Sequence, residues 1–132
     1  MQDIRWIQRL QNFKRANTLL QSSLTVVQPS QLERAGIIQF YEMAFELAWK
    51  TLKDYLQEQG FEATSPRQAI KQGFQAEVIK DGHNWFKALE DRNLTVHIYD
   101  EAKAQEVEND IRSLYAPLIQ QLVSYPEEQI DK

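Results

Sequence analysis

The first stretch of the chain carries apolar residues at alternating steps of four and three, which is the spacing of a helix with one buried seam. The seam residues are Trp6, Leu10, Phe13, Leu20, Leu24 and Val27. Asn17 falls on the same seam, where it either fixes the packing register or lies at the seam's edge, and we expect the edge. Pro29 and Ser30 end this segment.

The second segment predicts a long helix with clear end signals. Ser30 has the spacing of an N-cap with Glu33 as its capping-box partner, and Gly60 is the expected stop after a last turn near Gln59. Two apolar seams run along it; they comprise Ile37, Phe40, Ala44 and Leu47, and then Tyr41, Phe45, Ala48, Leu52 and Tyr55, with Trp49 and Leu56 beside them. A helix that is apolar around so much of its circumference is buried on several sides. We therefore expect one side in a bundle core and the other in a dimer interface.

A polar stripe occupies the rest of that helix, and three shorter patterns follow it. The stripe consists of Glu42, Glu46, Lys50 and Lys53, in which Glu46 and Lys50 are spaced for an ion pair. Ser65 and Pro66 predict the start of a short helix that Gly73 weakens and that ends before Asp81-Gly82. Another short helix is expected over 85–91, with His83 in the loop before it. The last helix is expected from near residue 97 to just before residue 126, with the seam Val107, Ile111, Leu114, Leu118 and Leu122.

No strand-like alternation appears, so the sequence predicts an all-α fold, and three long helices with shorter pieces suit an antiparallel bundle. The length of 132 residues corresponds to one domain, which we place at 1–125 with a polar tail over 126–132. Met1-Gln2-Asp3-Ile4-Arg5 leads directly into an amphipathic pattern, and no apolar stretch approaches the ~20 residues that cross a bilayer. We therefore expect no secretory signal, no membrane and a cytoplasmic location.

The amino-acid composition limits the kinds of site that we expect. The chain has no cysteine, no acidic or histidine cluster with metal-ligand spacing and no glycine-rich phosphate loop, so we expect no metal and no cofactor. Its net charge of −4 argues against a broad surface that coats nucleic acid, but leaves room for one local phosphate site.

Arg92 and His97 form an Arg-x4-His pair and are the strongest candidates for chemistry. An arginine can hold a phosphate and an imidazole can move a proton near neutral pH, which is what metal-free RNA cleavage requires. On one continuous helix the two residues would lie about 140° apart. A helix break between them, with Thr95 capping a new start, would place His97 in the first turn of the last helix, where the dipole favours a neutral imidazole. A capping or salt-bridge role is the alternative for both.

Two neighbours of this pair have their own alternatives. Asn93 either positions a phosphate or ends the helix, and we expect that it ends the helix. Tyr99 is either an exposed hydroxyl that a partner could modify or an ordinary half-buried tyrosine of the bundle.

Several motifs together resemble one known family. They are the run 41–56 (YEMAFELAWKTLKDYL), Ser65-Pro66-Arg67, Asp81-Gly82 with Trp85, and Asp91-Arg92-Asn93-Leu94-Thr95 with His97, Tyr99, Asp100 and Glu101. The chain is similar over roughly 1–120 to the nucleotidyltransferase substrate-binding proteins, a branch of the HEPN superfamily. Residues 75–79 lack a glycine that many relatives carry, and Ile98 stands where many have threonine.

The resemblance implies an antiparallel up-and-down four-helix bundle with a short extra helix. It also implies a homodimer that brings two Arg-x4-His motifs together, and a separately encoded minimal nucleotidyltransferase as partner. In such toxin–antitoxin pairs the HEPN chain is the ribonuclease toxin, and the transferase neutralises it by adding AMP to the motif tyrosine, here Tyr99.

Three functions remain open from the sequence. In the first, a ribonuclease toxin, His97 takes the proton of the ribose 2′-hydroxyl while Arg92 stabilises the phosphate, which leaves a 2′,3′-cyclic phosphate and a 5′-hydroxyl. In the second, a non-catalytic subunit uses Arg92 and Asn93 to bind a nucleotide or substrate for the transferase. In the third, the chain is a purely structural partner.

Overall fold

The computed structural model describes residues 4–95 and 100–126, with no strand among them. Its elements, in chain order, are α1 (Ile4–Ser23), α2 (Gln31–Glu58), α3 (Pro66–Gln75), α4 (Gly82–Leu94), α5 (Glu101–Asp110), the π-helical turn η2 (Ile111–Tyr115) and α6 (Ala116–Val123).

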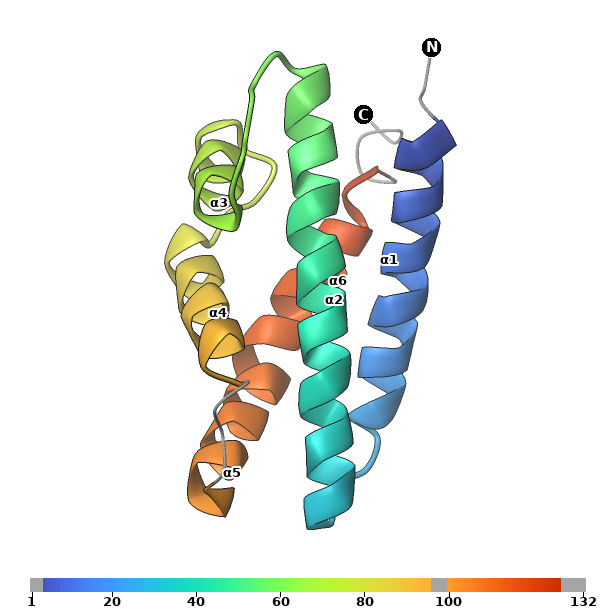
Figure 1. Cartoon of the computed structure of the whole chain (residues 1–132), viewed down its shortest axis with the longest axis vertical. Helices are drawn as coiled ribbons and strands as arrows, with labels where there is room; N and C mark the ends of the chain where they lie inside the picture. The colour runs from blue at the N-terminus through green and yellow to red at the C-terminus, as the bar shows by residue number, and fades with distance from the viewer. Residues whose placement is uncertain (1–3, 96–99, 127–132) are drawn as a thin grey trace.

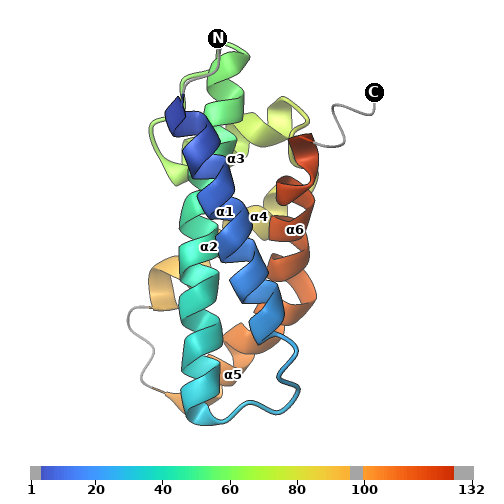
Figure 2. The same cartoon turned by 90° about the vertical axis from the view of Figure 1, so that its right-hand side faces the viewer.

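The helices form four antiparallel columns. In Figure 1, α1 descends from the N-terminus, α2 rises beside it, α4 descends on the other side of α2, and α5, η2 and α6 rise together as the fourth column. Figure 2 shows the same columns from the side, with α3 near the upper end of the bundle. The predicted up-and-down four-helix bundle with one short extra helix is confirmed.

Helix α2 begins and ends where its sequence signals predict. The Ser30 hydroxyl accepts a hydrogen bond from the Glu33 amide at 3.1 Å, and the Glu33 carboxylate accepts one from the Ser30 amide at 2.8 Å. At the other end Gly60 adopts φ +89°, a backbone conformation that residues with a β-carbon rarely adopt.

The two seams of α2 are largely covered within the single chain. Tyr41, Phe45 and Leu52 are completely buried, and the half-buried Phe40 and Leu47 also pack against the core. The double seam therefore needs no second subunit for most of its burial, and the dimer stays a prediction.

Helix α1 departs from its predicted seam in two places. It ends at Ser23, so Val27 lies beyond it and is 82% exposed. Asn17 is buried, contrary to the expected place at the seam's edge: its amide donates to the Gln120 side chain at 2.9 Å and accepts from Gln21 at 3.1 Å. A buried amide is stabilised only when it finds such partners, and here the partner lies on α6.

Helices α3 and α4 also differ from expectation. Gly73 lies against α2, and a β-carbon there would stand 2.9 Å from a methyl carbon of Leu52, so this glycine allows close packing. Helix α4 starts at Gly82 and continues to Leu94, because Asp81 accepts a hydrogen bond from the Asn84 amide and caps it early. His83 is exposed as expected, but it lies in a helix and not in a loop.

The last column starts later than predicted and contains an irregular turn. Its first helix begins at Glu101, because the Asp100 carboxylate caps it by accepting from the Ala102 amide at 3.0 Å. The π turn η2 follows at Ile111–Tyr115. Ala116 separates this turn from Pro117, which has no amide hydrogen to donate within a regular helix.

Candidate functional site around Arg92

Arg92 extends the buried stripe of α4. Trp85, Ala88 and Leu89 face the core, and Arg92 follows at the same helical spacing, seven residues after Trp85. Its side chain is therefore held against α2 and does not project freely into solvent.

The guanidinium of Arg92 forms an ion pair with α2. One terminal nitrogen lies 3.1 Å from a carboxylate oxygen of Glu46, whose other oxygen lies 3.3 Å from the Lys50 ammonium. Both side chains of the Arg92–Glu46 pair are about one third exposed, at 34% and 35%. The Nε of Arg92 is buried and has no hydrogen-bond partner within the described residues. Glu46 thus fixes the direction of the guanidinium. Because the side chain is 34% exposed and makes one ion-pair contact among the described residues, its remaining terminal N–H groups can still donate to a ligand.

Two buried tyrosines hold the last turns of α4 behind Arg92. The Tyr41 hydroxyl donates to the Ala88 carbonyl at 2.5 Å, and the Tyr115 hydroxyl donates to the Asp91 carboxylate. Their rings stack with 5.4 Å between centroids. Burial, and then the proximity of Tyr115, raises the pKa of Tyr41; burial, and then the hydrogen bond to Asp91, raises the pKa of Tyr115. Both phenols therefore stay protonated and serve as anchors.

The chain leaves the helix just after Arg92, as predicted. Helix α4 ends at Leu94, which confirms a break between Arg92 and position 97. The role predicted for Thr95 is wrong, because its hydroxyl donates to the Arg92 carbonyl at 2.7 Å and so closes α4. Asn93 is exposed within the last turn of α4 and does not itself end the helix.

His97 and Tyr99, the other two predicted site residues, lie outside the described residues. The first turn of α5 starts at Glu101, so the predicted helix start near residue 97 is wrong. The roles predicted for His97 and Tyr99 stay predictions.

A cavity of about 250 Å³ lies beside this break and is mostly acidic. Its charged lining residues are Glu42, Asp100, Glu101 and Arg34. The Arg34 guanidinium is already bonded to Glu101, Glu108 and the Pro29 carbonyl. This cavity therefore offers little to a phosphate.

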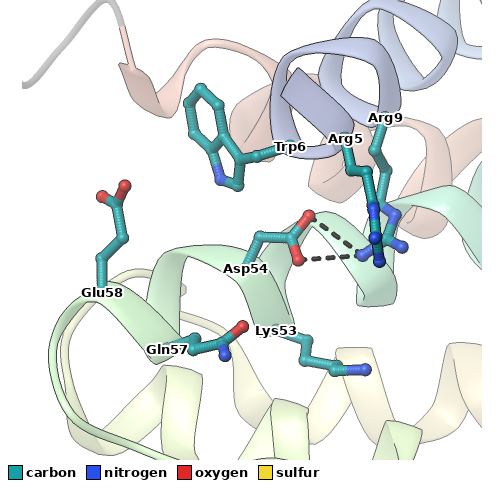
Figure 3. A pocket seen from close by; sticks show the side chains of 7 residues that line it. All are labelled: Arg5, Trp6, Arg9, Lys53, Asp54, Gln57 and Glu58. Atoms are coloured by element: carbon teal, nitrogen blue, oxygen red, sulfur yellow. Dashed lines mark hydrogen bonds and ion pairs between the residues drawn. The ribbon is translucent and has the colours of Figure 1, made fainter. Parts of the chain in front are cut away.

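A larger cavity, of about 430 Å³, lies between the start of α1 and the end of α2 (Figure 3). Its lining includes three basic residues, Arg5, Arg9 and Lys53, and two acids, Asp54 and Glu58. Arg9 donates to both oxygens of Asp54, at 2.8 and 3.0 Å (Figure 3). The pair joins α1 to α2 and neutralises much of the cavity's charge, so we assign it a structural role. The cavity has no signal in the sequence, because its residues come from two separate segments.

The described residues contain neither a group that could bind a metal ion nor a helix that could span a membrane. No group of three or more His, Asp or Glu side chains there could hold a metal ion. None of the helices described is both long and apolar enough to span a bilayer.

Glu46 is the site residue whose role the sequence did not reveal. Its four-residue spacing to Lys50 predicted the pair that forms, and the solvated stripe was its expected place. The contact with Arg92 joins residues 46 positions apart. Only the helical phase of Arg92, in line with Trp85, Ala88 and Leu89, could have indicated that it points toward α2.

Comparison with known proteins identifies related chains. A family model described as "nucleotidyltransferase substrate binding protein like" matches residues 8–127. A solved structure from Thermus thermophilus is 31% identical, with a TM-score of 0.80, and the match covers 85% of this chain and 96% of that one. The search of curated proteins found no match.

Two more distant structures share the fold. One is the tri-AMPylated HEPN toxin of Shewanella oneidensis in complex with its MNT antitoxin, with a TM-score of 0.75, 16% identity, and coverage of 96% of this chain and 99% of that one. The other belongs to a mutant of the MntA–HpeT toxin–antitoxin pair, with a TM-score of 0.74, 16% identity, and coverage of 93% and 97%. At this identity they show that the chain shares the helical fold of these two proteins.

Proposed function

The chain belongs to the nucleotidyltransferase substrate binding protein like family, and from this premise we propose that it is the HEPN-type partner of a separately encoded minimal nucleotidyltransferase. Two structures with the same fold come from toxin–antitoxin pairs, one of which contains an MNT antitoxin. Within such a pair this chain is the toxin, a metal-independent ribonuclease that acts as a homodimer.

The observation that carries the proposal is the position of Arg92. It stands in the last turn of α4, immediately before the break that leads to His97, and Glu46 fixes its direction without using all of its donors. A partly exposed, directed arginine suits the binding of a phosphate whose charge increases during reaction. Because the pair is about one third exposed, its net strength is modest, and a phosphate can displace Glu46.

The proposed reaction needs two groups. His97 removes the proton of the ribose 2′-hydroxyl, and the 2′-oxygen attacks the adjacent phosphorus. The bond from phosphorus to the 5′-oxygen breaks, and this oxygen takes up a proton. Arg92 stabilises the added negative charge, and the products are a 2′,3′-cyclic phosphate and a 5′-hydroxyl.

A metal-free cleavage assay tests this activity. Purified chain, His97→Ala and Arg92→Ala are incubated with RNA in EDTA, with Arg15→Ala as a control because Arg15 is an exposed arginine on α1. We expect cleavage with cyclic phosphate ends by the unaltered chain and the control, and a loss of about 100-fold or more in either site variant. Equal cleavage by His97→Ala would contradict the catalytic assignment.

A second candidate is a non-catalytic subunit that binds a nucleotide for the transferase. The ion pair of Arg92 and the acidic cavity beside it leave few cations for the several phosphates of an RNA strand, whereas a single nucleotide needs one phosphate contact, which Arg92 can provide. Nucleotide binding that Arg92→Ala abolishes, without any RNA cleavage by the unaltered chain, would favour this alternative.

Tyr99 is the proposed acceptor of AMP from the partner. Incubation with the transferase and ATP should increase the mass of the chain by AMP additions, and Tyr99→Phe should prevent them. Tyr125→Phe is the control, because Tyr125 packs on Tyr55 at 5.2 Å between ring centroids. Full modification of Tyr99→Phe would assign the acceptor elsewhere.

A further inference from the structure

A groove separate from Arg92 runs between α3 and α4. Its walls are Lys71, Phe74 and Gln75 on α3 and Gly82, His83 and Phe86 on α4, and it encloses about 340 Å³. This volume lies in the range of small-molecule sites. We call it the α3–α4 groove.

The groove exposes an aromatic ring that the fold does not bury. The core residues of α3 are Ala69, Ile70 and Gly73, whereas Phe74 points outward and is 52% exposed. Gly82 lies beside this ring, and a β-carbon there would stand 3.4 Å from two of its carbons. On the other wall, the guanidinium carbon of Arg67 lies 5.4 Å from the centroid of the Phe86 ring, which places a planar cation beside the groove.

The lining of the groove carries one formal positive charge, on Lys71, although the whole chain carries −4. Arg67 lies one turn before Lys71 on α3, and its contact with Phe86 places a second cation at the edge of the groove. No carboxylate is among the described residues that line it. The neighbouring Asp81 carboxylate is occupied by the backbone and side-chain amides of Asn84, at 3.2 and 2.7 Å.

This combination matches how proteins hold single-stranded nucleic acid. Each base has an apolar face that stacks on an aromatic ring, and each phosphate is held by nearby cations. The larger cavity between α1 and α2 lacks this character, because Asp54 and Glu58 oppose its cations. An acidic peptide could use Lys71 and Arg67, but it would leave the exposed ring of Phe74 without a stacking partner.

We propose that the α3–α4 groove binds one nucleotide of a single-stranded RNA, with the base on Phe74 and a phosphate between Arg67 and Lys71. The choice of RNA rests on the proposed ribonuclease function. The groove would hold the strand outside the reacting centre, while Arg92 lies further along α4 toward its C-terminal end.

The test measures binding apart from cleavage. Fluorescence anisotropy with a labelled oligoadenylate RNA is recorded in EDTA on a His97→Ala background, with Phe74→Ala and Lys71→Glu added singly. Leu19→Ala and Lys14→Glu serve as matched controls, since both positions are exposed on α1, across α2 from the groove (Figure 1). Circular dichroism checks that each variant is folded.

We expect Phe74→Ala to weaken RNA binding about fivefold or more, the effect of losing one stacked base. Lys71→Glu should weaken it and reduce its dependence on salt, because one phosphate contact is lost. The two controls should bind as the background does.

Unchanged affinity in both groove variants would overturn the proposal, as would a folded background protein that binds no RNA. Sedimentation and a pull-down test whether the groove is instead a protein interface. If the groove variants sediment as monomers where the background protein is a dimer, or no longer bind the transferase, the groove is a protein interface and the RNA proposal fails. Binding through the groove by a chain that does not cut RNA would sink the ribonuclease function and leave this proposal standing. Cleavage that the groove variants do not affect, with unchanged binding, would do the reverse.

Discussion

Two clusters of arginine and glutamate in this bundle use the same side chains differently. In the first, Glu108 is 6% exposed and its two oxygens accept from the Nε atoms of Arg34 and Arg112, both at 2.7 Å. The other nitrogens of Arg112 donate to the carbonyls of Leu24 and Val26, at 2.7 and 2.6 Å. We call Glu108, Arg34 and Arg112 the Glu108 cluster.

The second cluster is Arg92 with Glu46, where a single 3.1 Å contact joins two side chains that are about one third exposed. Every nitrogen of Arg112 is bonded, whereas the Nε of Arg92 has no partner among the described residues. An arginine whose nitrogens are all hydrogen-bonded holds the fold together. The partly exposed guanidinium of Arg92 makes one ion-pair contact among the described residues, and its other terminal N–H groups remain available to a ligand.

The largest effect should follow from removing Glu108. Glu108→Ala leaves Arg34 and Arg112 without their shared carboxylate in a mostly buried place, and we expect the free energy of unfolding to fall by about 3 kcal/mol. Urea unfolding followed by circular dichroism measures this. Glu106→Ala is the control, since Glu106 is an exposed acid of the same helix. A loss no larger than in the control would show that the cluster is not a structural element.

A smaller loss is expected for Arg112→Lys. Lysine keeps the charge, but a single ammonium cannot reach Glu108 and the two carbonyls at once, so we expect a loss of about 1–2 kcal/mol. Hydrogen exchange should also become faster in residues 24–29, which these bonds hold to the fourth column. Stability equal to that of the unaltered chain would mean that the charge alone matters.

The Glu108 cluster should also make stability depend on pH. Burial by itself would raise the pKa of the Glu108 carboxyl, but hydrogen bonds from Arg34 and Arg112 outweigh it and hold the pKa below its ordinary value. A lowered folded-state pKa contributes stability above the unfolded value, roughly 4.3, and that stability is lost as pH falls through the folded-state pKa. Glu108→Gln should therefore show a flatter dependence of the urea midpoint on pH below about 4.3. A curve parallel to that of the unaltered chain would contradict this.

The smallest effect on stability is expected at Glu46. Because the Arg92 pair is partly exposed, Glu46→Gln should change the free energy of unfolding by less than about 1 kcal/mol. The same change frees the guanidinium, so RNA or nucleotide binding should become tighter if Arg92 is the phosphate ligand. Titration calorimetry compares it with Glu42→Gln, a nearby acid on the same stripe. Weaker binding in Glu46→Gln alone would show that Glu46 positions Arg92 and does not compete for it.

Most ends of the helices can be predicted from the sequence, whereas the contacts between helices cannot. Local rules predict the helix ends and the apolar seams, because a cap or a seam involves residues only a few positions apart. Examples are the caps at Ser30, Ser65 and Gly60 and the helix end after Arg92. The family motifs predicted the four-helix bundle and the family to which the chain belongs. The predicted start of the last helix near residue 97 is wrong. Asp100 caps this helix at Glu101, whereas the Thr95 hydroxyl donates back to α4.

The partners of the buried polar groups follow from the three-dimensional packing of the helices. Asn17 with Gln120, Arg92 with Glu46 and Arg34 with Glu108 join residues 103, 46 and 74 positions apart. Nothing in the local sequence distinguishes these polar residues from exposed ones. The packing of the columns decides which of them are buried and find hydrogen-bond partners. Periodicity and caps are local, so the order of the helices, most of their ends and the Arg-x4-His candidate can be read from the amino-acid sequence. Which arginine is structural and which is free for a ligand depends on distances between helices, and only folding sets those.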